Sequence, residues 1–301
     1  MYASTKMRKI EELFREIRFI LLIFKERRLP MIGLIILAIM TFIAIFAPLI
    51  VPYPEDCIGR ATRVEERFKP PSLEHLFGTD LLGRDVFSRV LWGARYSLTA
   101  AVVIVAISVA IGWPLGVIAG YKGGIIKDII MRITDIFLVF PSLVLALIIA
   151  YTLGPSLINS MIAVSATWWP WYTRLAQVEA SSLREQPFIE AARALGLSDA
   201  KIIFRHIFPN TMTPIIIQAS ADLGTALLIE SGLSFLGLGA QRPTPEWGLM
   251  ISEGRQFVFS AWWCSLFPGI FIFITALAFN LIGDGLREAL DPKLRKIRRV
   301  G

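Results

Sequence analysis

Long runs without a charged side chain limit the folding of this chain more than any other feature of its sequence. Residues 29–54, 96–121 and 256–283 carry no charge, and another 38 uncharged residues extend from Ile136 to Thr173. Charged residues make up 18% of the 301, against about 25% in a typical soluble domain. A hydrocarbon core about 30 Å thick is crossed by a helix of about 20 mostly apolar residues. The runs therefore predict an all-α, polytopic membrane protein.

Six transmembrane helices are predicted from these runs. Gly154-Pro155-Ser156 divides the longest run into two, because proline cannot continue a helix and glycine commonly ends one. The fifth span is less uniform than the others, because it contains Asp222 and Glu230. The predicted spans are, in chain order, Met31–Ile50, Ser97–Ala119, 131–153, 157–173, Pro214–Leu236 and Trp262–Ile282.

The distribution of Lys and Arg predicts the orientation of these spans. If the N-terminus is inside, 22 of the 31 basic residues fall in cytoplasmic segments, and cytoplasmic loops carry the excess of Lys and Arg in membrane proteins. Outer loop 51–96 holds seven basic and seven acidic residues, but long loops are poor orientation signals. Both termini are therefore predicted to be cytoplasmic, in a multi-pass protein of the cell (inner) membrane. The net charge of +7 follows this topology and indicates no nucleic-acid partner.

The segment before the first span predicts an amphipathic helix along the inner membrane surface, because apolar residues recur there every three or four positions. These residues are Ile10, Leu13, Phe14, Ile17, Leu21 and Phe24. The predicted parts of the chain are a cytoplasmic amphipathic segment (1–30), the first span with an extracytoplasmic loop (31–95), a five-helix core (96–287) containing a cytoplasmic loop (183–210), and a basic cytoplasmic tail (288–301).

Motifs for catalysis or metal binding are absent from the sequence. There is neither a G-x-x-x-x-G-K-[ST] phosphate loop nor a G-x-S-x-G nucleophile motif. His75 and His206 fall on opposite sides of the predicted membrane, so they cannot share a zinc ion. Cys57 and Cys264 fit no metal-ligand spacing, although they could pair if both face outward. We therefore predict no catalytic residue, no metal site and no cofactor in this chain.

Loop 183–210 predicts two short helices. Pro187 is suited to the first turn of a helix, and Gly196 is suited to its end. Ser198 is a favourable N-cap for a second helix, which Pro209 is predicted to limit.

The first of these helices carries a small face with charged neighbours. Ala191 and Ala192 would let another protein surface approach closely, and Glu190 and Arg193 would lie at the rim. The alternative interpretation is an ordinary helical hairpin between two spans.

This loop resembles the EAA loop of binding-protein-dependent ABC importer permeases. The residues that match the pattern at the right spacing are Glu190, Ala191, Ala192, Gly196 and Pro209. His206 replaces the usual isoleucine and Phe208 the usual leucine. The segment Arg205–Asn210 is similar to that of the dipeptide/oligopeptide permease branch.

Other segments extend the resemblance over roughly residues 70–292. Phe77–Leu98 is similar to the segment that this branch carries before its second span. Leu233–Gly239 and Pro245–Gly248 are similar to its segments at and after span five. Several such segments in one order are more specific than the EAA pattern alone.

The resemblance implies the fold of a type I ABC importer permease and the role of a C-type subunit in a peptide importer. Implied partners are a second, B-type permease, two cytoplasmic ATPase subunits that bind ATP and Mg²⁺, and an extracytoplasmic substrate-binding protein. Relatives assigned to nickel, glutathione or oligosaccharides leave the substrate open. The residues implied to couple the chain to the ATPase subunits are Glu190, Ala191, Ala192, Arg193, Gly196, Arg205, His206 and Pro209.

Asp222 and Glu230 are the candidate residues of the translocation pathway. A charge at the centre of a bilayer costs on the order of 3 kcal/mol, so such residues usually face a pathway or a partner. Eight residues apart on a helix, they point about 80° away from each other. They would meet cationic groups of a peptide or pair with the companion permease. A different class of protein, an ion-coupled transporter, would use both as a proton relay, but it would give the EAA loop no purpose.

Three local contacts are also predicted. Asp85 and Arg89 are spaced as a favourable i,i+4 helix pair, and Arg132 and Asp135 are spaced as an i,i+3 pair. An aromatic belt at the membrane interface is expected at the end of span four. Its members are Trp168, Trp169, Trp171 and Tyr172.

Overall fold

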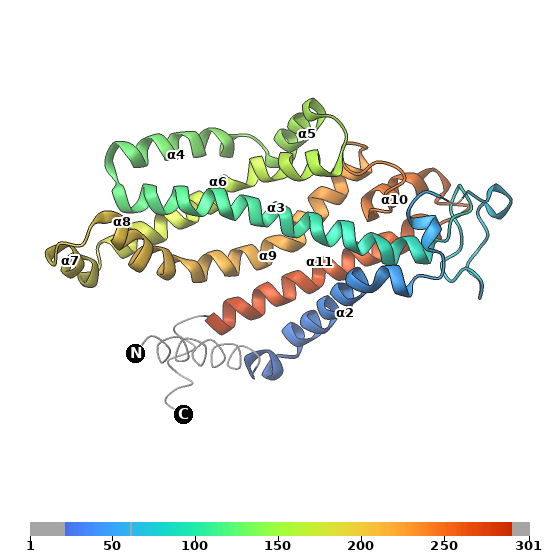
Figure 1. The fold of residues 1–301 in the computed structure, drawn as a ribbon, viewed down its shortest axis with the longest axis horizontal. Helices are drawn as coiled ribbons and strands as arrows, with labels where there is room; N and C mark the ends of the chain where they lie inside the picture. Colours follow the sequence, from blue (N-terminus) through green and yellow to red (C-terminus); the bar gives the residue numbers. More distant parts are fainter. Residues whose placement is uncertain (1–21, 61, 291–301) are drawn as a thin grey trace.

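A computed structural model of the chain describes residues 22–60 and 62–290, which form helices and the loops that join them (Figure 1). The helices are α2 (Arg28–Ile50), α3 (Val86–Lys122), α4 (Gly124–Val139), α5 (Ser142–Leu153), α6 (Leu157–Arg184), α7 (Pro187–Ala194), α8 (Asp199–Ile202), α9 (Phe208–Phe235), α10 (Trp247–Gly254) and α11 (Trp263–Leu290). Shorter 3₁₀ turns are Pro54–Cys57, Val64–Glu66 and Arg255–Phe257, and a π-helical turn covers Ile203–Ile207. The predicted all-α class is confirmed. Most of the predicted amphipathic N-terminal helix and most of the basic tail lie outside the described residues.

Four helices of the described chain are long and apolar enough to cross a membrane: α2, α3, the continuous helix from Asp199 to Phe235, and α11. A fifth is added if α4 and α5 count as one bent span. The predicted number of six is not confirmed, because α6, at the predicted fourth span, is not among them. One side of α6 is buried along α3 and α9, and a helix covered by other helices need not be apolar all round.

The predicted third span, 131–153, is wrong as a continuous helix. α4 and α5 are separate helices that meet at 90°. Phe140 adopts an extended backbone with ψ of 139°, and Pro141 caps the next helix. This break follows from chemistry, since proline disfavours the helical conformation of the residue before it. The predicted break at Gly154 is confirmed, with a positive φ of 87°.

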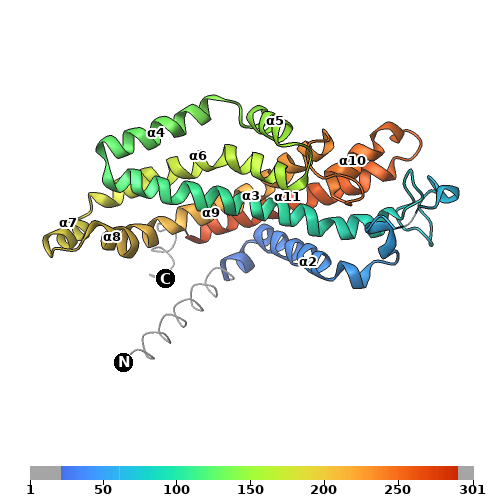
Figure 2. The ribbon, with the colours of Figure 1, turned by 45° about the horizontal axis from the view of Figure 1, so that its top comes forward.

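The long helices lie side by side, and the connecting segments gather at the two ends (Figures 1 and 2). α7 and α8 project at one end, whereas segment 51–85 and α10 lie at the other. The first residues of α2 and the last residues of α11 point toward the α7 end (Figure 1). This arrangement places segments predicted to be cytoplasmic at one end of the bundle. Which membrane side that end faces stays a prediction from the charge distribution.

A stripe of three glycines brings α3 and α6 into backbone contact. A Cβ atom on Gly112, Gly116 or Gly120 would lie 2.3, 2.3 and 2.4 Å, respectively, from a carbonyl oxygen of α6. Small residues four apart form one face of a helix and let two helices approach closely in a membrane. Sequence reasoning missed this stripe, although its four-residue spacing was a usable signal.

Candidate functional site

The first predicted helix of the 183–210 loop is confirmed as α7. Pro187 occupies its first turn, where the missing N–H has no helical partner to lose. Gly196 ends the helix with φ of 77°, a conformation that glycine adopts without steric cost. The N–H of Leu197 donates to the Ala192 carbonyl over 3.2 Å, and the N–H of Gly196 donates to Arg193 over 2.9 Å. These bonds fix the angle at which the loop turns back.

The two alanines of α7 have different environments. Ala191 is exposed, but Ala192 is 7% exposed and packs with Ile189 against the core of its own chain. The idea that both alanines form the open face is therefore wrong for Ala192, because the helix needs an apolar side toward the bundle. Glu190 and Arg193 are exposed as predicted.

The outer surface of the loop also carries large apolar side chains. Leu195 is 80% exposed and Phe204 is 73% exposed, on either side of the turn at Gly196. Of the other candidate coupling residues, Arg205 and Pro209 are exposed and His206 is partly exposed, with its ring 6.3 Å from that of Phe188. Exposed apolar residues rimmed by charge are typical of a protein-binding surface. Sequence reasoning missed this apolar component.

The second predicted helix begins after Ser198, but its hydroxyl makes no capping bond. The prediction that Pro209 limits this helix is wrong. α8 passes through the π-helical turn at Ile203–Ile207 into α9, so the chain is one helix from Asp199 to Phe235. Proline removes one helical donor and crowds the preceding turn, and a wider π turn at that point accommodates both changes.

The end of α3 holds this loop in place. The Tyr121 hydroxyl and the Lys122 ammonium donate to the two carboxylate oxygens of Asp199 over 2.9 and 2.6 Å. The guanidinium of Arg193 lies over the Tyr121 ring, 5.2 Å from its centre. α3 therefore connects the loop to the glycine stripe and to the far end of the bundle.

A cavity of about 520 Å³ opens beside Asp222. Asp222 accepts hydrogen bonds from the Tyr172 hydroxyl over 2.6 Å and from the Gln218 amide over 2.9 Å. The residues that line the cavity are Ser142, Trp168, Trp171, Arg174, Leu175, Gln218, Asp222, Thr225 and Ile229. The cavity thus combines aromatic walls with one carboxylate and one guanidinium.

Two predicted local contacts in this region are wrong. Trp168, Trp169 and Tyr172 are buried between helices rather than forming an interfacial belt; only Trp171 of the four is exposed. Asp135 pairs with Arg174 of α6 instead of Arg132. Both errors arise because tertiary neighbours compete with local ones.

Glu230 does not line this cavity. Its side chain is completely buried, and its carboxylate accepts a hydrogen bond from the Ser234 hydroxyl over 2.9 Å. The hydroxyl of Ser160 on α6 lies 3.5 Å away. Glu230 and Asp222 therefore occupy separate environments on α9.

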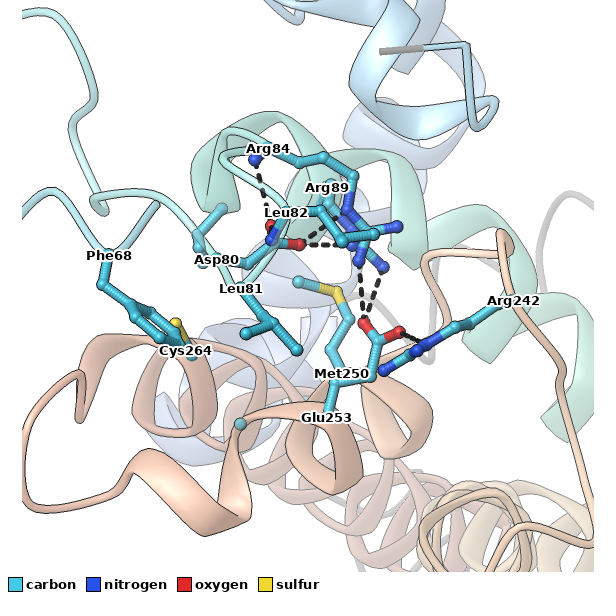
Figure 3. A pocket seen from close by; sticks show the side chains of 12 residues that line it. Phe68, Asp80, Leu81, Leu82, Arg84, Arg89, Arg242, Met250, Glu253 and Cys264 are labelled. Carbon is cyan, nitrogen blue, oxygen red and sulfur yellow. Dashed lines mark hydrogen bonds and ion pairs between the residues drawn. The ribbon is translucent and has the colours of Figure 1, made fainter. Parts of the chain in front are cut away.

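A buried charge cluster closes the opposite end of the bundle (Figure 3). The Asp80 carboxylate accepts from Arg84 over 2.7 Å and from Arg89 over 2.6 Å. Both guanidinium groups also contact Glu253 of α10 at 3.1 Å, and Arg242 donates to the same carboxylate over 2.5 Å. These ion pairs join segment 51–85, α3 and α10.

The predicted Asp85–Arg89 pair is wrong. The Asp85 carboxylate instead caps α3, accepting from the N–H of Ser88 over 2.7 Å, and it contacts His75 Nδ1 at 2.9 Å. Arg89 is 1% exposed and turns toward Asp80. A capping bond contributes more than a helix-surface pair, and a buried guanidinium such as that of Arg89 must be paired because an uncompensated buried charge is strongly destabilising.

We expect this cluster to make the end of the bundle opposite α7 sensitive to acid. Burial raises the pKa of Asp80, but Arg89, Arg84 and backbone donors outweigh it and hold that pKa below its usual value of 3.8. Its stabilising contribution is therefore present above about pH 4 and is lost as the pH falls through the lowered pKa. Asp80→Asn should remove this acid dependence and cost about 3 kcal/mol, because it leaves Arg89 poorly paired. Thermal unfolding of the detergent-purified protein between pH 3 and 7 measures both effects.

Few described side chains could hold a metal ion. Glu66, Glu74 and His75 place one ligand atom each within 4.8 Å of the others. However, the Glu66 carboxylate already contacts Lys69 at 3.0 Å and Arg63 at 3.2 Å, so the group is better described as an ion-pair network.

The two cysteines do not form a disulfide. Cys57 and Cys264 are both free and buried. Burial raises the pKa of the Cys57 thiol to about 12, which keeps it protonated and unreactive at neutral pH.

Comparison with known proteins defines the class of this chain. Residues 112–296 match the model of the binding-protein-dependent transport system inner membrane component, and residues 18–71 match the N-terminal transmembrane domain of oligopeptide transport permease C. The chain therefore belongs to the family of binding-protein-dependent transport system inner membrane components, multi-pass proteins of the inner membrane.

Individual relatives cover nearly the whole chain. It is 49% identical to the dipeptide transport system permease protein DppC of Alkalihalophilus pseudofirmus, over 90% of this chain and 88% of the relative. It is 44% identical to the probable D,D-dipeptide transport system permease protein DdpC of Escherichia coli K12, over 89% of both. The glutathione transport system permease protein GsiD of Escherichia coli O6:K15:H31 is 43% identical, over 90% of this chain and 89% of the relative.

The fold is that of an ABC importer permease. An inward-facing structure of the MetNI methionine ABC transporter superposes with a TM-score of 0.53, covering 68% of this chain and 98% of that chain at 19% identity. At this identity the likeness concerns the fold. It supports the predicted type I importer architecture.

Proposed function

We propose that this chain is the C-type, membrane-spanning subunit of an ATP-driven peptide importer and transmits the closure of ATPase subunits to its spans. The observation that carries the proposal is the α7–α8 loop, which offers an exposed apolar and charged surface while its base is fixed to α3. In this proposal the chain is not catalytic and holds no cofactor, because partner subunits bind ATP and Mg²⁺. A second permease and an extracytoplasmic binding protein complete the complex.

Peptides are the proposed substrate class. The relatives' names refer to dipeptides, D,D-dipeptides and glutathione, which share amide-linked amino acids with charged termini. The carboxylate of Asp222 and the guanidinium of Arg174 suit the two ends of such a molecule, and the tryptophans suit its side chains. Nickel is less well matched, because this cavity offers a single carboxylate and no imidazole or thiolate.

The pathway is proposed to pass Asp222 rather than Glu230. Asp222 borders the cavity, whereas Glu230 is enclosed by its own chain. The alternative of an ion-coupled transporter loses its support for two reasons. A proton relay through Asp222 and Glu230 would need both acids to lie on one route, and permeases of this family work with ATP-driven partners. In this proposal the chain is divided into segments 1–30, 31–95, 96–287 and 288–301.

The function is tested by reconstituting the chain with its partner permease, ATPase subunits and binding protein in vesicles. Peptide uptake should require ATP and should persist without a pH gradient. A panel of dipeptides, longer peptides, glutathione and nickel should show peptide-stimulated ATPase activity. Uptake driven by a pH gradient without ATP would refute the proposal, and stimulation by nickel alone would refute its substrate class.

Asp222→Asn should reduce uptake of peptides with a free amino terminus about tenfold, because a hydrogen bond to a charged group contributes about 1.5–3 kcal/mol. Uptake of N-acetylated peptides should change much less. Initial rates for both peptides in the same vesicles measure the difference. Equal losses for both would indicate a structural role for Asp222. Leu175→Ile in the same cavity is the control, since it preserves volume and charge.

A further inference from the structure

Helices α9 and α10 meet at the end of the bundle opposite α7 (Figure 2). Two carboxyl groups are buried at this junction. Glu230 lies on α9, and Glu246 is the N-cap residue of α10. Both residues are 0% exposed. The Ser231 hydroxyl of α9 lies 3.4 Å from a Glu246 oxygen, and the Ser234 hydroxyl of α9 lies 2.9 Å from a Glu230 oxygen, so the two carboxyl groups share one serine-lined pocket. Two carboxylates in one pocket are acceptors only, so neither can donate to the other unless it carries a proton.

Helices α3, α6 and α9 surround this pair with neutral hydroxyl groups. The hydroxyls nearest the two carboxyls belong to Ser97 of α3, Ser160 of α6, and Ser231 and Ser234 of α9. Among the ion pairs of the described chain, none includes Glu230 or Glu246. Within residues 22–60 and 62–290, therefore, no Lys, Arg or His side chain forms an ion pair with either carboxyl group.

The two carboxyl groups differ in their hydrogen bonds. Glu246 accepts the N–H groups of Gly248 and Leu249, one on each oxygen and each at 2.8 Å. Both bonds favour an ionised Glu246. Glu230 accepts from Ser234, but its Oε2 atom is buried and accepts from no donor. The proton therefore belongs on Glu230.

The surroundings leave little room for a hydrated cation. A Cβ atom on Gly248 would lie 2.1 Å from the Ser231 carbonyl oxygen, and one on Gly93 would lie 2.2 Å from the Pro245 carbonyl oxygen. α10 is thus pressed against both α9 and α3. The Trp247 indole also donates to the Val90 carbonyl over 2.8 Å. A proton is the cation that fits such a contact.

We propose that Glu230 and Glu246 form a proton-binding site, in which one proton carried by Glu230 and shared with Glu246 fastens the end of α9 to the start of α10. Adjacent buried carboxyls cannot both be ionised without a compensating charge. The bound proton stays in place and is not transported. The site thereby holds α9 against α10 at the end of the bundle opposite α7, whatever substrate the protein carries.

Infrared spectroscopy of the complete transporter in lipid nanodiscs at neutral pH tests this site. The wild type should show the carbonyl band of a protonated carboxylic acid, and Glu230→Gln should abolish that band. Glu65→Gln, an exposed acid with no contact to the pair, should leave it unchanged. A wild-type spectrum without such a band, or a band that survives Glu230→Gln, would overturn the proposal.

Thermal unfolding of the same variants gives an independent readout. Glu230→Gln should keep the wild-type midpoint, because its amide donates to Glu246 as the protonated acid does. Glu246→Gln should lower the midpoint, because an amide nitrogen cannot accept the second N–H at the start of α10. If Glu230→Gln is as destabilising as Glu246→Gln, Glu230 is not the protonated partner and the proposal is wrong. Equal stability of all three proteins would also contradict it.

Discussion

Gly116→Ala should destabilise the protein and reduce the amount of folded subunit recovered from membranes. The added Cβ would lie 2.3 Å from the Thr173 carbonyl oxygen and 2.6 Å from the Ala176 side chain. No rotamer relieves a contact made by Cβ itself, so α3 and α6 must separate. Overpacking of this kind costs typically 1–3 kcal/mol, and Gly116→Leu should exceed that range. The midpoint of thermal unfolding and size-exclusion recovery in detergent measure both variants.

Gly232→Ala is the matched control for this substitution. Gly232 also lies within a long helix, α9, and a Cβ built there meets nothing within 4 Å. Both replacements gain up to about 1 kcal/mol of helix propensity, so the difference between them isolates the packing of α3 against α6. Equal midpoints for the two variants would show that the glycine stripe is not a close contact.

Glu190→Lys should leave the subunit folded and inserted but lower ATP-driven uptake by about 100-fold. Glu190 is exposed, and no ion pair or hydrogen bond of its side chain is seen within the described chain, so reversal of its charge has little to disturb locally. At a docking surface the same change brings like charges together, which costs several kcal/mol. Phe204→Asp should act in the same direction by removing an exposed apolar contact. Co-purification of ATPase subunits and uptake per ATP hydrolysed measure the effect.

Glu65→Lys provides the same charge reversal at the other end of the molecule. Glu65 is exposed in the 3₁₀ turn Val64–Glu66, so the Glu65→Lys variant should retain the ATPase subunits. If Glu190→Lys and Phe204→Asp both co-purify with the ATPase subunits and transport normally, the loop is an ordinary helical hairpin between spans and not a docking surface. A loss of folded protein in either variant would contradict the surface position of that residue.

The sequence predicted the elements whose causes are local. Uncharged runs predicted helices at α2, α3 and α11, and a mostly apolar run predicted α9, because transfer of apolar side chains to lipid is favourable wherever they occur. Pro187 and Gly196 predicted the limits of α7, because their backbone preferences act within one turn. The predictions failed where the backbone preference of proline and the apolar length of a segment favoured different structures. Pro141 broke the predicted span 131–153 although that segment is apolar, and a π turn continued the helix through Pro209.

The candidate coupling loop was found from the sequence, but its surface was not. The spacing from Glu190 to Gly196 is a chain pattern, so it can be read directly. The burial of Ala192 and the exposure of Phe204 depend on how α7 and α8 lie against α3. Asp199 accepts a hydrogen bond from Tyr121, 78 residues away along the chain. No pattern of neighbouring residues in the sequence predicts such a contact.

The sequence by itself therefore determined that the chain is a helical membrane protein, where most helices begin, and which loop resembles a coupling element. Only the tertiary structure decided which charges meet. Arg89 joins Asp80 and Glu253 rather than Asp85, Tyr172 meets Asp222, and Glu230 shares a serine-lined pocket with Glu246. The physical reason is that backbone preferences and transfer to lipid act over a few residues. The partner of a buried polar group, by contrast, depends on which helix packs against it.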